Sequence, residues 1–493
     1  MLGVEAGRRI RSSGSNDSTQ SELRVLLLST SLLVDRVLLY SDLVPELSRT
    51  GTVDIWASSY EVGASAEYWD ELDANVDHFP RIRPFKEFPY NYLRRLNEYV
   101  WDFRYRPPSR LSMMKHRRNK RSHFVIRALK PPARILASVR GERLLERSLE
   151  RLLLSYPRSE EAKARLEAAR PDVVVVTGPF QFEQPAVVAA AKELGIPTLA
   201  YIPSWDNVST KNRMVFDYDG YIVWNETIKN ELNEFYPRSA DRPVYVVGAP
   251  QFDLLSGSRF EVSRQRFCEE QDLDPDLPIV VYAIGSPNFL NEPPGAEHLA
   301  KRVAEGHLGE IQLLIRPHPI HDNGEMRRMF DNLTPAVRLQ TTPNAGKNLT
   351  RRTQDEAQIV EWFNTFRHAD VVVNMSSTVT IDAALFDTPV VNLDFDPQPG
   401  QPDQELIKEI NHRWEHFRPI AESGGVWLVN DFQELESAIK SYLEDPALHS
   451  EKRRWIAEYV CGYLDGACGK RMADAIAKFV AEEVPGEASG LGR

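Results

Sequence analysis

Short apolar runs, each followed by a longer stretch with helical periodicity, recur along this chain. The runs are continuous rather than alternating, which is typical of strands buried on both faces of a parallel sheet. Six lie in the first half of the chain, at 24–29, 53–58, 172–177, 198–202, 221–224 and 244–247. Five follow residue 275, at 278–284, 312–315, 370–373, 389–393 and 426–429. Between them, stretches such as 183–194 and 377–386 predict right-handed helical crossovers.

This pattern predicts an α/β fold with two Rossmann-like, doubly wound parallel sheets in succession and a cleft between them. A length of 493 residues suits two domains. We expect a polar tail at 1–22, an N-terminal domain at 23–250, an acidic, proline-containing linker at 251–277, a C-terminal domain at 278–460, a last helix at 461–484 and a second tail at 485–493. The last two helical stretches, 450–463 and 468–483, have no strand after them, so they should pack across one domain or over both.

Composition narrows the class of protein. With 42% hydrophobic and 27% charged residues the chain is globular, and a net charge of −11 argues against nonspecific nucleic-acid binding by the whole chain. Three cysteines, Cys268, Cys461 and Cys468, are too few and too widely spaced for a disulfide framework or a zinc site. The most apolar early run is about half the length of a membrane span, and residues 1–22 lack the apolar centre of a secretion signal. We therefore expect a cytoplasmic protein.

The segment 104–140 departs from this acidic background, because it holds twelve Lys and Arg and no acidic residue, interleaved with apolar side chains. Such a segment suits an anionic membrane surface, which would make the protein peripheral on the inner face of the membrane. A cationic wall for an anionic substrate and a solvated insertion are the alternatives.

Polar residues that follow the apolar runs of the second half form the most specific pattern. Ligands of open α/β sheets bind beyond the carboxyl ends of the strands. The residues in those places are Gly285, Ser286 and Asn288, then Arg316-Pro317-His318-Pro319, then Ser376, Ser377 and Thr378.

These residue types suit a phosphate. The guanidinium of Arg316 can form paired bonds to phosphate oxygens, and His318 lies two residues further along an extended backbone, on the same side. A Ser/Thr turn before a helix offers hydroxyls and backbone N–H groups to an anion, although the same turn also serves as plain capping. Gly285 allows backbone to approach a ligand closely, or simply makes a turn. No GxGxxG run, Walker-type loop, HExxH run or cysteine-rich metal set occurs, so we expect neither a cofactor nor a metal.

Two Rossmann-like halves, the run Gly248-Ala249-Pro250, the RPHP run and the Ser-Ser-Thr turn together resemble the GT-B glycosyltransferase superfamily. RPHP and the Ser-Ser turn are similar to motifs of bacterial sialyl- and Kdo-transferases and of the CDP-glycerol glycerophosphotransferases. The resemblance implies that the domain at 23–250 binds the acceptor and the domain at 278–460 binds the nucleotide-activated donor. It also implies that His318, Ser376 and Ser377 hold the phosphates of this nucleotide-activated sugar without a bound metal. Retaining members often carry two Glu eight residues apart. Here those positions hold Asp382 and Val390, which favours an inverting mechanism. Asp382 would then form a hydrogen bond with the ribose or face solvent.

An inverting transfer needs a residue that accepts the proton of the acceptor hydroxyl. Asp206 is the first candidate, because it follows a strand and Trp205 beside it suits a sugar face, with Asn207 as a further acceptor contact. Asp-Asn is also ordinary turn chemistry. Glu183 and Asp35 are the other candidates, and either could instead favour a helix N-terminus.

Other functions stay open. Glycerophosphotransferases use a first-domain His, and here His78, His116 and His123 follow no clear strand. A sugar-nucleotide 2-epimerase would share the fold, but its early GTRPE-like run is absent, and a non-catalytic GT-B-like protein is the remaining alternative. Base recognition is expected in the polar connection 341–355. The acceptor is expected to be a glycan or a lipid-linked molecule of surface glycan or glycolipid biosynthesis.

Overall fold

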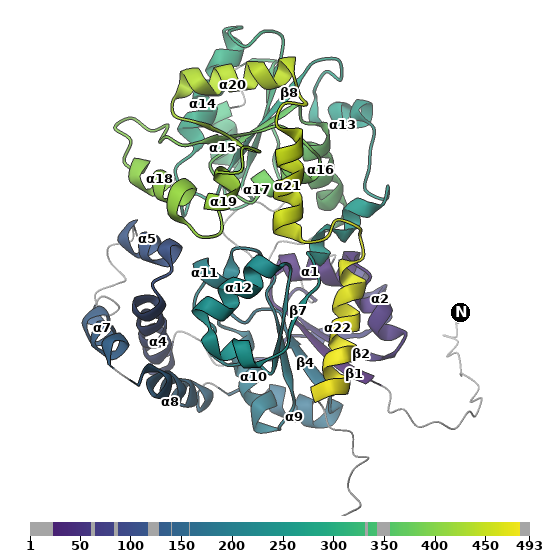
Figure 1. The fold of residues 1–493 in the computed structure, drawn as a ribbon. Helices are drawn as coiled ribbons and strands as arrows, with labels where there is room; N and C mark the ends of the chain where they lie inside the picture. The colour runs from purple at the N-terminus through teal and green to yellow at the C-terminus, as the bar shows by residue number, and fades with distance from the viewer. Residues whose placement is uncertain are drawn as a thin grey trace, which may run out of the picture.

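A computed structural model describes residues 23–60, 65–82, 87–116, 128–139, 141–156, 158–330, 334–342 and 355–483, and it contains two parallel sheets in two lobes (Figure 1). The predicted fold class is confirmed. Both predicted tails, 1–22 and 485–493, lie outside the described residues.

The first sheet has the order β3-β2-β1-β4-β5-β6-β7, and all its pairs are parallel. Its strands are β1 Leu23–Ser29, β2 Gly51–Ala57, β3 Asn75–His78, β4 Val173–Val176, β5 Thr198–Tyr201, β6 Gly220–Val223 and β7 Val244–Val246. The second sheet has the order β10-β9-β8-β11-β12-β13. Its strands are β8 Ile279–Ile284, β9 Gln312–Pro317, β10 Val337–Leu339, β11 Val371–Asn374, β12 Val390–Leu393 and β13 Trp427–Val429.

All eleven predicted runs form strands, whereas the sequence pattern did not predict the edge strands β3 and β10. Neither forms the continuous apolar run that identified the others: β3 reads NVDH with alternating exposure, and β10 has three residues, of which two are half-buried. An edge strand is covered on fewer sides, so its sequence needs fewer apolar positions. His78, the last residue of β3, therefore does end a strand, contrary to the prediction.

Helices cover both faces of each sheet, as doubly wound topology requires. In the N-terminal lobe they are α1 Leu32–Tyr40, α2 Leu43–Ser48, α3 Ser65–Asp70, α4 Tyr90–Tyr105, α5 Pro108–His116, α7 Lys130–Ser138, α8 Glu142–Leu154, α9 Glu160–Ala169, α10 Gln184–Glu193, α11 Asn207–Thr210 and α12 Glu226–Phe235. The residues after β7 form the 3-10 helix η2 Pro250–Ser256 and α13 Arg264–Gln271, so the segment 251–277 contains ordered helices. The C-terminal lobe has α14 Pro293–Ala304, α15 Asn323–Phe330, α16 Glu356–His368, α17 Val379–Leu385, α18 Gln404–Arg413, α19 Arg418–Ala421 and α20 Phe432–Glu444.

The last two helices, α21 Ser450–Cys461 and α22 Cys468–Glu483, join the lobes. α21 packs on α17 of the C-terminal lobe, whereas α22 packs on α2 and β6 of the N-terminal lobe (Figure 1). Asp253 accepts hydrogen bonds from the backbone N–H groups of Cys468 (3.0 Å) and Gly469 (2.6 Å), which fixes the start of α22. The chain therefore crosses between the lobes a second time.

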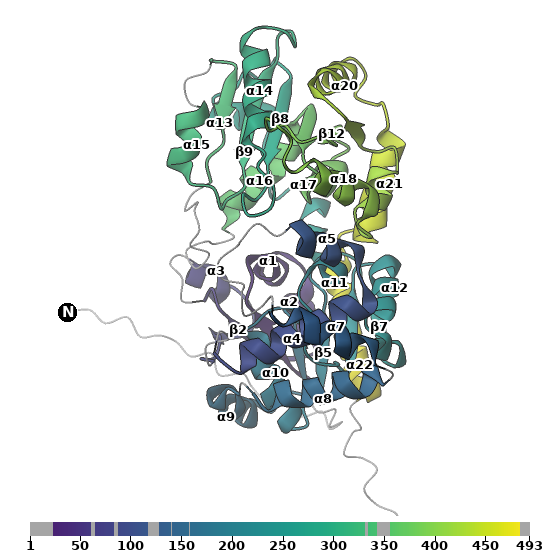
Figure 2. The same ribbon diagram turned by 90° about the vertical axis from the view of Figure 1, so that its left-hand side faces the viewer.

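The helices α4, α5, α7 and α8 form a layer outside the first sheet (Figure 2). Part of this layer has a small hydrophobic core of its own, formed by Tyr99, Val100, Leu129, Ala133, Ala137 and Leu149. In the part of the chain that the structure describes, no helix is long and apolar enough to cross a membrane.

Candidate active site

A cavity of about 390 Å³ lies between the lobes, at the carboxyl ends of β8, β9 and β11. In the second sheet β8 and β11 are neighbours whose connections leave in opposite directions, which is where ligands of such sheets bind. Seven of the predicted donor-binding residues line this cavity: Gly285, Ser286, Arg316, His318, Ser376, Ser377 and Thr378. From the N-terminal lobe, the loop after β5 faces them with Trp205, Asp206 and Lys211.

The loop after β8 is tied to the loop after β11 by Glu292. Its buried carboxyl group accepts hydrogen bonds from the backbone N–H groups of Gly285 and Met375, and burial raises its pKa to about 8 despite these bonds. A Cβ at position 285 would lie 2.3 Å from Glu292 Oε1, so any larger residue there would displace the Glu292 carboxyl group. Gly285 thus makes room for a side chain that the sequence analysis missed, since nothing in the local sequence marks Glu292 as buried.

Arg316 is a half-buried cation of the cavity. Desolvation lowers its pKa, against the opposing charges of Glu361 and Asp382, and its Nε has no hydrogen-bond partner among the described residues. The guanidinium carbon lies 5.5 Å from the ring centroid of Phe366. A guanidinium that lies near an aromatic ring and two acids, and whose Nε–H has no partner among the described residues, is suited to an anionic ligand.

His318 lines the same cavity with its ring orientation fixed by the backbone. Its Nδ1 accepts the N–H of Ile320 at 3.1 Å, so in the neutral ring the proton is on Nε2. His318 N–H donates to the carbonyl of Ile284 at 2.8 Å, which continues the strand pairing past Pro317. In the neutral ring, His318 therefore adds an Nε2–H donor of defined orientation to the guanidinium donors of Arg316.

The Ser-Ser-Thr turn is held by Asn374 at the end of β11. Asn374 Oδ1 accepts hydrogen bonds from Ser377 N (3.0 Å), Ser377 Oγ (3.2 Å) and Thr380 Oγ1 (3.3 Å). Ser376 has a positive φ of 50°, which turns the backbone sharply, and its hydroxyl bonds Asn411. Part of the hydroxyl capacity of this turn is therefore committed to the protein.

Asp382 lies in a second, smaller cavity of about 230 Å³ on the other side of Trp205 and Thr378. Burial raises its pKa, whereas a hydrogen bond from Trp362 and the charges of Arg36 and Arg316 lower it. Arg36 of α1 lies over the ring of Trp362 at 4.5 Å, so a cation–π contact bridges the two lobes here. Asp382 is thus enclosed between the lobes rather than facing solvent.

The carboxylate of Asp206 is strongly held. Burial raises its pKa, but the charges of Lys211 and His416 and hydrogen bonds from Ser204 (2.7 Å) and Thr210 (3.0 Å) lower it to about 2. Such a carboxylate stays ionised and accepts a proton poorly near neutral pH.

His416 is a buried imidazole on the opposite wall, and the sequence analysis did not single it out. Burial lowers its pKa to about 4, against the charge of Asp206, so the ring is neutral at pH 7. Its ring centroid lies 5.0 Å from that of Trp205, and Nδ1 has no hydrogen-bond partner among the described residues. Its position after α18, away from any strand end, gave no signal in the sequence.

Several predicted residues lie away from the main cavity. Asp35 lies in the first turn of α1 and is buried, with Ser29 and Ser59 bonded to its carboxyl group, and burial raises its pKa to about 6. Glu183 does not line the cavity and bonds Phe182 N–H. Asn288 is exposed and lines a neighbouring cavity, and the amide of Asn207 bonds Asp206. The structure therefore leaves Asp35 and Glu183 without access to a donor in this cavity.

The helix α5 spans from the N-terminal lobe to α18 (Figure 2). Ser109 Oγ donates to Glu415 Oε1 at 2.7 Å, and Lys115 Nζ and His116 Nε2 lie 3.0 and 3.1 Å from the carboxylate of Glu409. In the basic segment 104–140, Lys115 therefore binds acids of the other lobe, and Arg104 and Arg110 pair with Glu142 and Asp102. Residues 117–127 and 140 lie outside the described residues.

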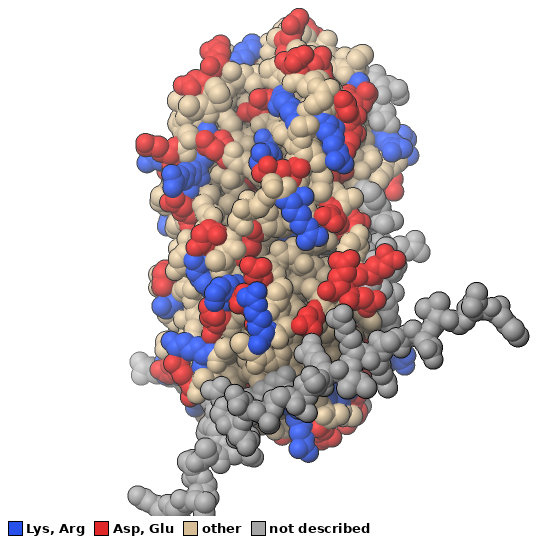
Figure 3. Space-filling view, turned by 90° about the vertical axis from the view of Figure 1, so that its right-hand side faces the viewer, with Lys and Arg blue, Asp and Glu red and all other residues tan. Residues whose placement is uncertain are grey.

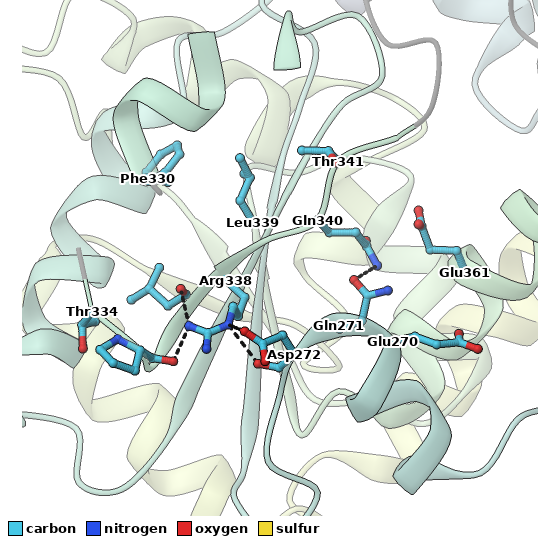
Figure 4. A pocket seen from close by; sticks show the side chains of 12 residues that line it. Glu270, Gln271, Asp272, Phe330, Thr334, Arg338, Leu339, Gln340, Thr341 and Glu361 are labelled. Carbon is cyan, nitrogen blue, oxygen red and sulfur yellow. Dashed lines mark hydrogen bonds and ion pairs between the residues drawn. The ribbon is translucent and has the colours of Figure 1, made fainter. Parts of the chain in front are cut away.

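A larger cavity, of about 770 Å³, lies beside the edge strand β10 (Figure 4). Its cation is committed to the protein, because Arg338 Nε donates to Asp272 O (2.9 Å) and Asp272 Oδ2 (2.8 Å). It therefore offers an anionic ligand less than the interlobe cavity does. The predicted base-recognition segment 341–355 begins here, but 343–354 lie outside the described residues.

Among the described residues, no group of three or more His, Cys, Asp or Glu side chains is arranged to hold a metal ion. The His78 ring bonds Asp77 (2.7 Å) and Glu161 (3.2 Å) and does not line the interlobe cavity.

Comparison with known proteins supports the fold. No family model matches the sequence, and no curated protein matches it. A putative UDP-N-acetylglucosamine 2-epimerase from Listeria monocytogenes is similar in structure with a TM-score of 0.54 and 14% identity, over 94% of this chain and 97% of that one. UDP-GlcNAc 2-epimerase from Neisseria meningitidis, bound to UDP-GlcNAc, gives 0.50 and 14% over 92% and 99%. A glycosyltransferase from Rickettsia africae gives 0.50 and 10% over 94% and 99%. The GT-B fold that the motifs implied is confirmed.

Proposed function

We propose that this GT-B protein is a glycosyltransferase that moves a sugar from a nucleotide-activated donor to an acceptor hydroxyl with inversion. The observation that carries the proposal is the cavity in which Arg316 and His318 face the loop of Trp205 and Asp206 from the opposite lobe. Buried, fixed donors stabilise the charge of a departing phosphate more than water does, because they need no reorganisation.

The chemistry follows from this arrangement. The donor's diphosphate lies against Arg316, His318 and the Ser376–Thr378 turn, with its sugar toward Trp205. The acceptor oxygen attacks the anomeric carbon, its proton passes to a base, and the bond to the phosphate breaks on the opposite side. Closure by Trp205, Trp414 and Phe417 would exclude water, which otherwise competes as acceptor.

The adjoining cavity favours transfer over epimerisation. It has a volume of about 460 Å³, it shares Met113 and Phe289 with the donor cavity, and it extends between α4, α5 and α18. This space would accept a glycan or a lipid-linked acceptor. A 2-epimerase is the second candidate, since the donor cavity itself is enclosed by aromatic rings and would suit a reaction with one substrate.

A substrate screen tests the function. Thermal shift with UDP, CMP, CDP and GDP identifies the nucleotide, and the matching nucleotide sugars are then incubated with and without a glycan or lipid-linked acceptor. Acceptor-dependent release of nucleotide supports the transferase. Conversion of UDP-GlcNAc alone would identify an epimerase, turnover of CDP-glycerol would identify a glycerophosphotransferase, and no binding of any nucleotide would point to a non-catalytic protein.

His318 should contribute one directional hydrogen bond. Because Nδ1 is occupied by the N–H of Ile320, we expect Nε2–H to contact the phosphate. His318→Ala should therefore lower nucleotide release about 100-fold with the fold intact. His318→Gln, whose amide nitrogen can reach the position of Nε2, should recover part of this loss, whereas His318→Asn should not. Equal rates for all four proteins in a steady-state assay would contradict the assignment.

His416 is the better proton acceptor for the attacking hydroxyl. It is neutral at pH 7, and the ionised Asp206 would stabilise the imidazolium that forms. We expect His416→Gln to lower kcat at least about 100-fold, as loss of a general base does. Asp206→Asn, which keeps most of the loop's hydrogen bonds, should cost no more than about tenfold. The reverse order of the two effects would return Asp206 to the role of base.

A further inference from the structure

The outer face of α8 carries a regular stripe of basic and apolar side chains. Arg143, Arg147 and Arg151 are exposed at intervals of four, and Leu144 and Leu152 beside them are 70% and 49% exposed. None of the three arginines has an ion-pair partner in the described part of the chain. The stripe therefore presents positive charge and hydrocarbon together.

The acidic residues of α8 are turned away from this stripe. Glu142 pairs with Arg104, and Glu146 is buried. Glu150 is buried as well, with Arg213 at 3.1 Å and Arg238 beside it. A helix with three arginines and three glutamates thus has a purely cationic outer side, which its sequence alone does not reveal.

The neighbouring elements of the outer layer continue the face. On α7, Ala133 and Ala137 pack into the layer's own core, whereas Ile135 and Val139 just beyond the helix are 65% and 52% exposed, and Arg134 beside Ile135 is exposed too. At the start of α4, Phe88 is 79% exposed. This start lies beside the end of α8, since the Tyr90 and Tyr156 ring centroids are 6.2 Å apart.

We propose that this outer face, made of α7, α8 and the start of α4, docks on the surface of an anionic lipid bilayer. Arginine side chains at intervals of four bind lipid phosphates, while leucine, isoleucine and phenylalanine between them enter the boundary of the acyl chains. The chain carries a net charge of −11, so an anionic surface would repel it at any face without a local excess of positive charge.

Charge and composition separate this face from other surfaces. The opposite side of the molecule shows acidic and basic side chains interspersed (Figure 3), whereas α4, α7 and α8 lie together on the side seen in Figure 2. A nucleic-acid site would need the arginines but gains nothing from exposed Leu144, Leu152 and Ile135. A site for a second copy of this chain would need the apolar residues but not the three arginines of α8. Glu87, exposed beside Phe88 and bonded by the Tyr156 hydroxyl, is an acidic residue at the edge of this otherwise basic face.

The test uses the full chain and sedimentation with vesicles of phosphatidylcholine alone or with about 30% phosphatidylglycerol, an anionic lipid. We expect binding to the anionic vesicles only, weakening as salt is raised. Replacing Arg143, Arg147 and Arg151 by serine should weaken binding about 100-fold, from roughly fivefold for each basic side chain. Leu144→Ser with Leu152→Ser should weaken it at least about tenfold.

Matched controls separate the face from bulk charge and bulk hydrophobicity. Arg49, Arg266 and Arg454 are exposed, pair with acids on their own helices or just beside them, and give the same change in net charge when replaced by serine. Leu464→Ser removes a comparably exposed leucine elsewhere. These variants should bind as the parent protein does.

Three results would overturn the proposal. The first is no binding to anionic vesicles at about 0.1 M salt, where screening is moderate. The second is equal weakening of binding in the control variants, and the third is a preference for RNA over vesicles in competition. Self-association in ultracentrifugation that the Leu144/Leu152 variant abolishes, without vesicle binding by the parent protein, would assign the face to a second copy. Circular dichroism of each variant establishes that it is folded. Because the readout is binding to lipid, the outcome is independent of the proposed transferase activity.

Discussion

Replacement of Arg316 by glutamine is expected to raise the dissociation constant of a nucleoside diphosphate about 100-fold. The side chain is half-buried, its buried Nε has no hydrogen-bond partner among the described residues, and it is the central cation of the interlobe cavity. Removing a buried, charge-assisted hydrogen bond to a ligand costs about 3 kcal/mol, which corresponds to roughly two orders of magnitude in affinity. Calorimetric titration with UDP, followed by CMP, CDP and GDP, measures the change.

Two controls sharpen this experiment. Arg316→Lys keeps the charge but removes the paired donors, so its affinity should fall between those of the parent protein and the glutamine variant. Arg338→Gln removes an arginine of the larger cavity beside β10, whose guanidinium is committed to Asp272 and neighbouring carbonyls, and should leave nucleotide affinity unchanged. If Arg338→Gln weakened binding and Arg316→Gln did not, the nucleotide site would belong beside β10.

Glu292→Gln is expected to stabilise the protein increasingly as pH rises. Burial raises the pKa of Glu292 from 4.5 to about 8, so between these values the folded protein holds a proton that the unfolded chain releases. The stability of the parent protein must therefore fall with rising pH over this window. Glutamine is neutral at every pH and still accepts the two backbone N–H bonds. Its advantage should grow from about 1 kcal/mol at about pH 5 to about 4 kcal/mol at about pH 8.

Urea unfolding at about pH 5, 6, 7 and 8 measures this advantage. Glu422→Gln, at an exposed position, serves as the control and should show no such trend. Glu292→Ala would remove both backbone bonds as well as the carboxyl group, so it should be destabilised at every pH and lower nucleotide affinity by releasing the two loops. A constant difference between Glu292→Gln and the parent protein across the pH range would show that Glu292 does not titrate in this window.

The two predictions concern different properties of one structure. Arg316 acts on the ligand directly, whereas Glu292 holds the loops after β8 and β11 so that the residues beside them keep their positions. We expect Arg316→Gln to change nucleotide affinity without changing stability, and Glu292→Gln to change stability with little effect on affinity. This difference would distinguish a residue that contacts the ligand from one that positions the loops.

The sequence by itself determined the two sheets and the residues at their carboxyl ends. Continuous apolar runs identify strands buried on both faces, because such strands meet hydrocarbon on each side, and the residues that follow them must gather at one edge. Gly285, Arg316, His318 and Ser376 to Thr378 follow such runs, and all of them line the cavity. The edge strands β3 and β10 carry no such run, because an incompletely covered strand can do without it, although the edge strands β7 and β13 do carry one.

Only the tertiary structure decided the rest of the site and the character of the outer layer. Glu292 and His416 are held by burial and by partners distant in the chain, and the charge state of a carboxyl group or an imidazole depends on that surrounding rather than on local sequence. Asp35 and Asp206 follow strands as the pattern requires, yet packing buries Asp35 in the first turn of α1 and surrounds Asp206 with hydrogen-bond donors. The exposed stripe of α8 likewise exists only because packing buries Glu146 and Glu150 and pairs Glu142 with Arg104.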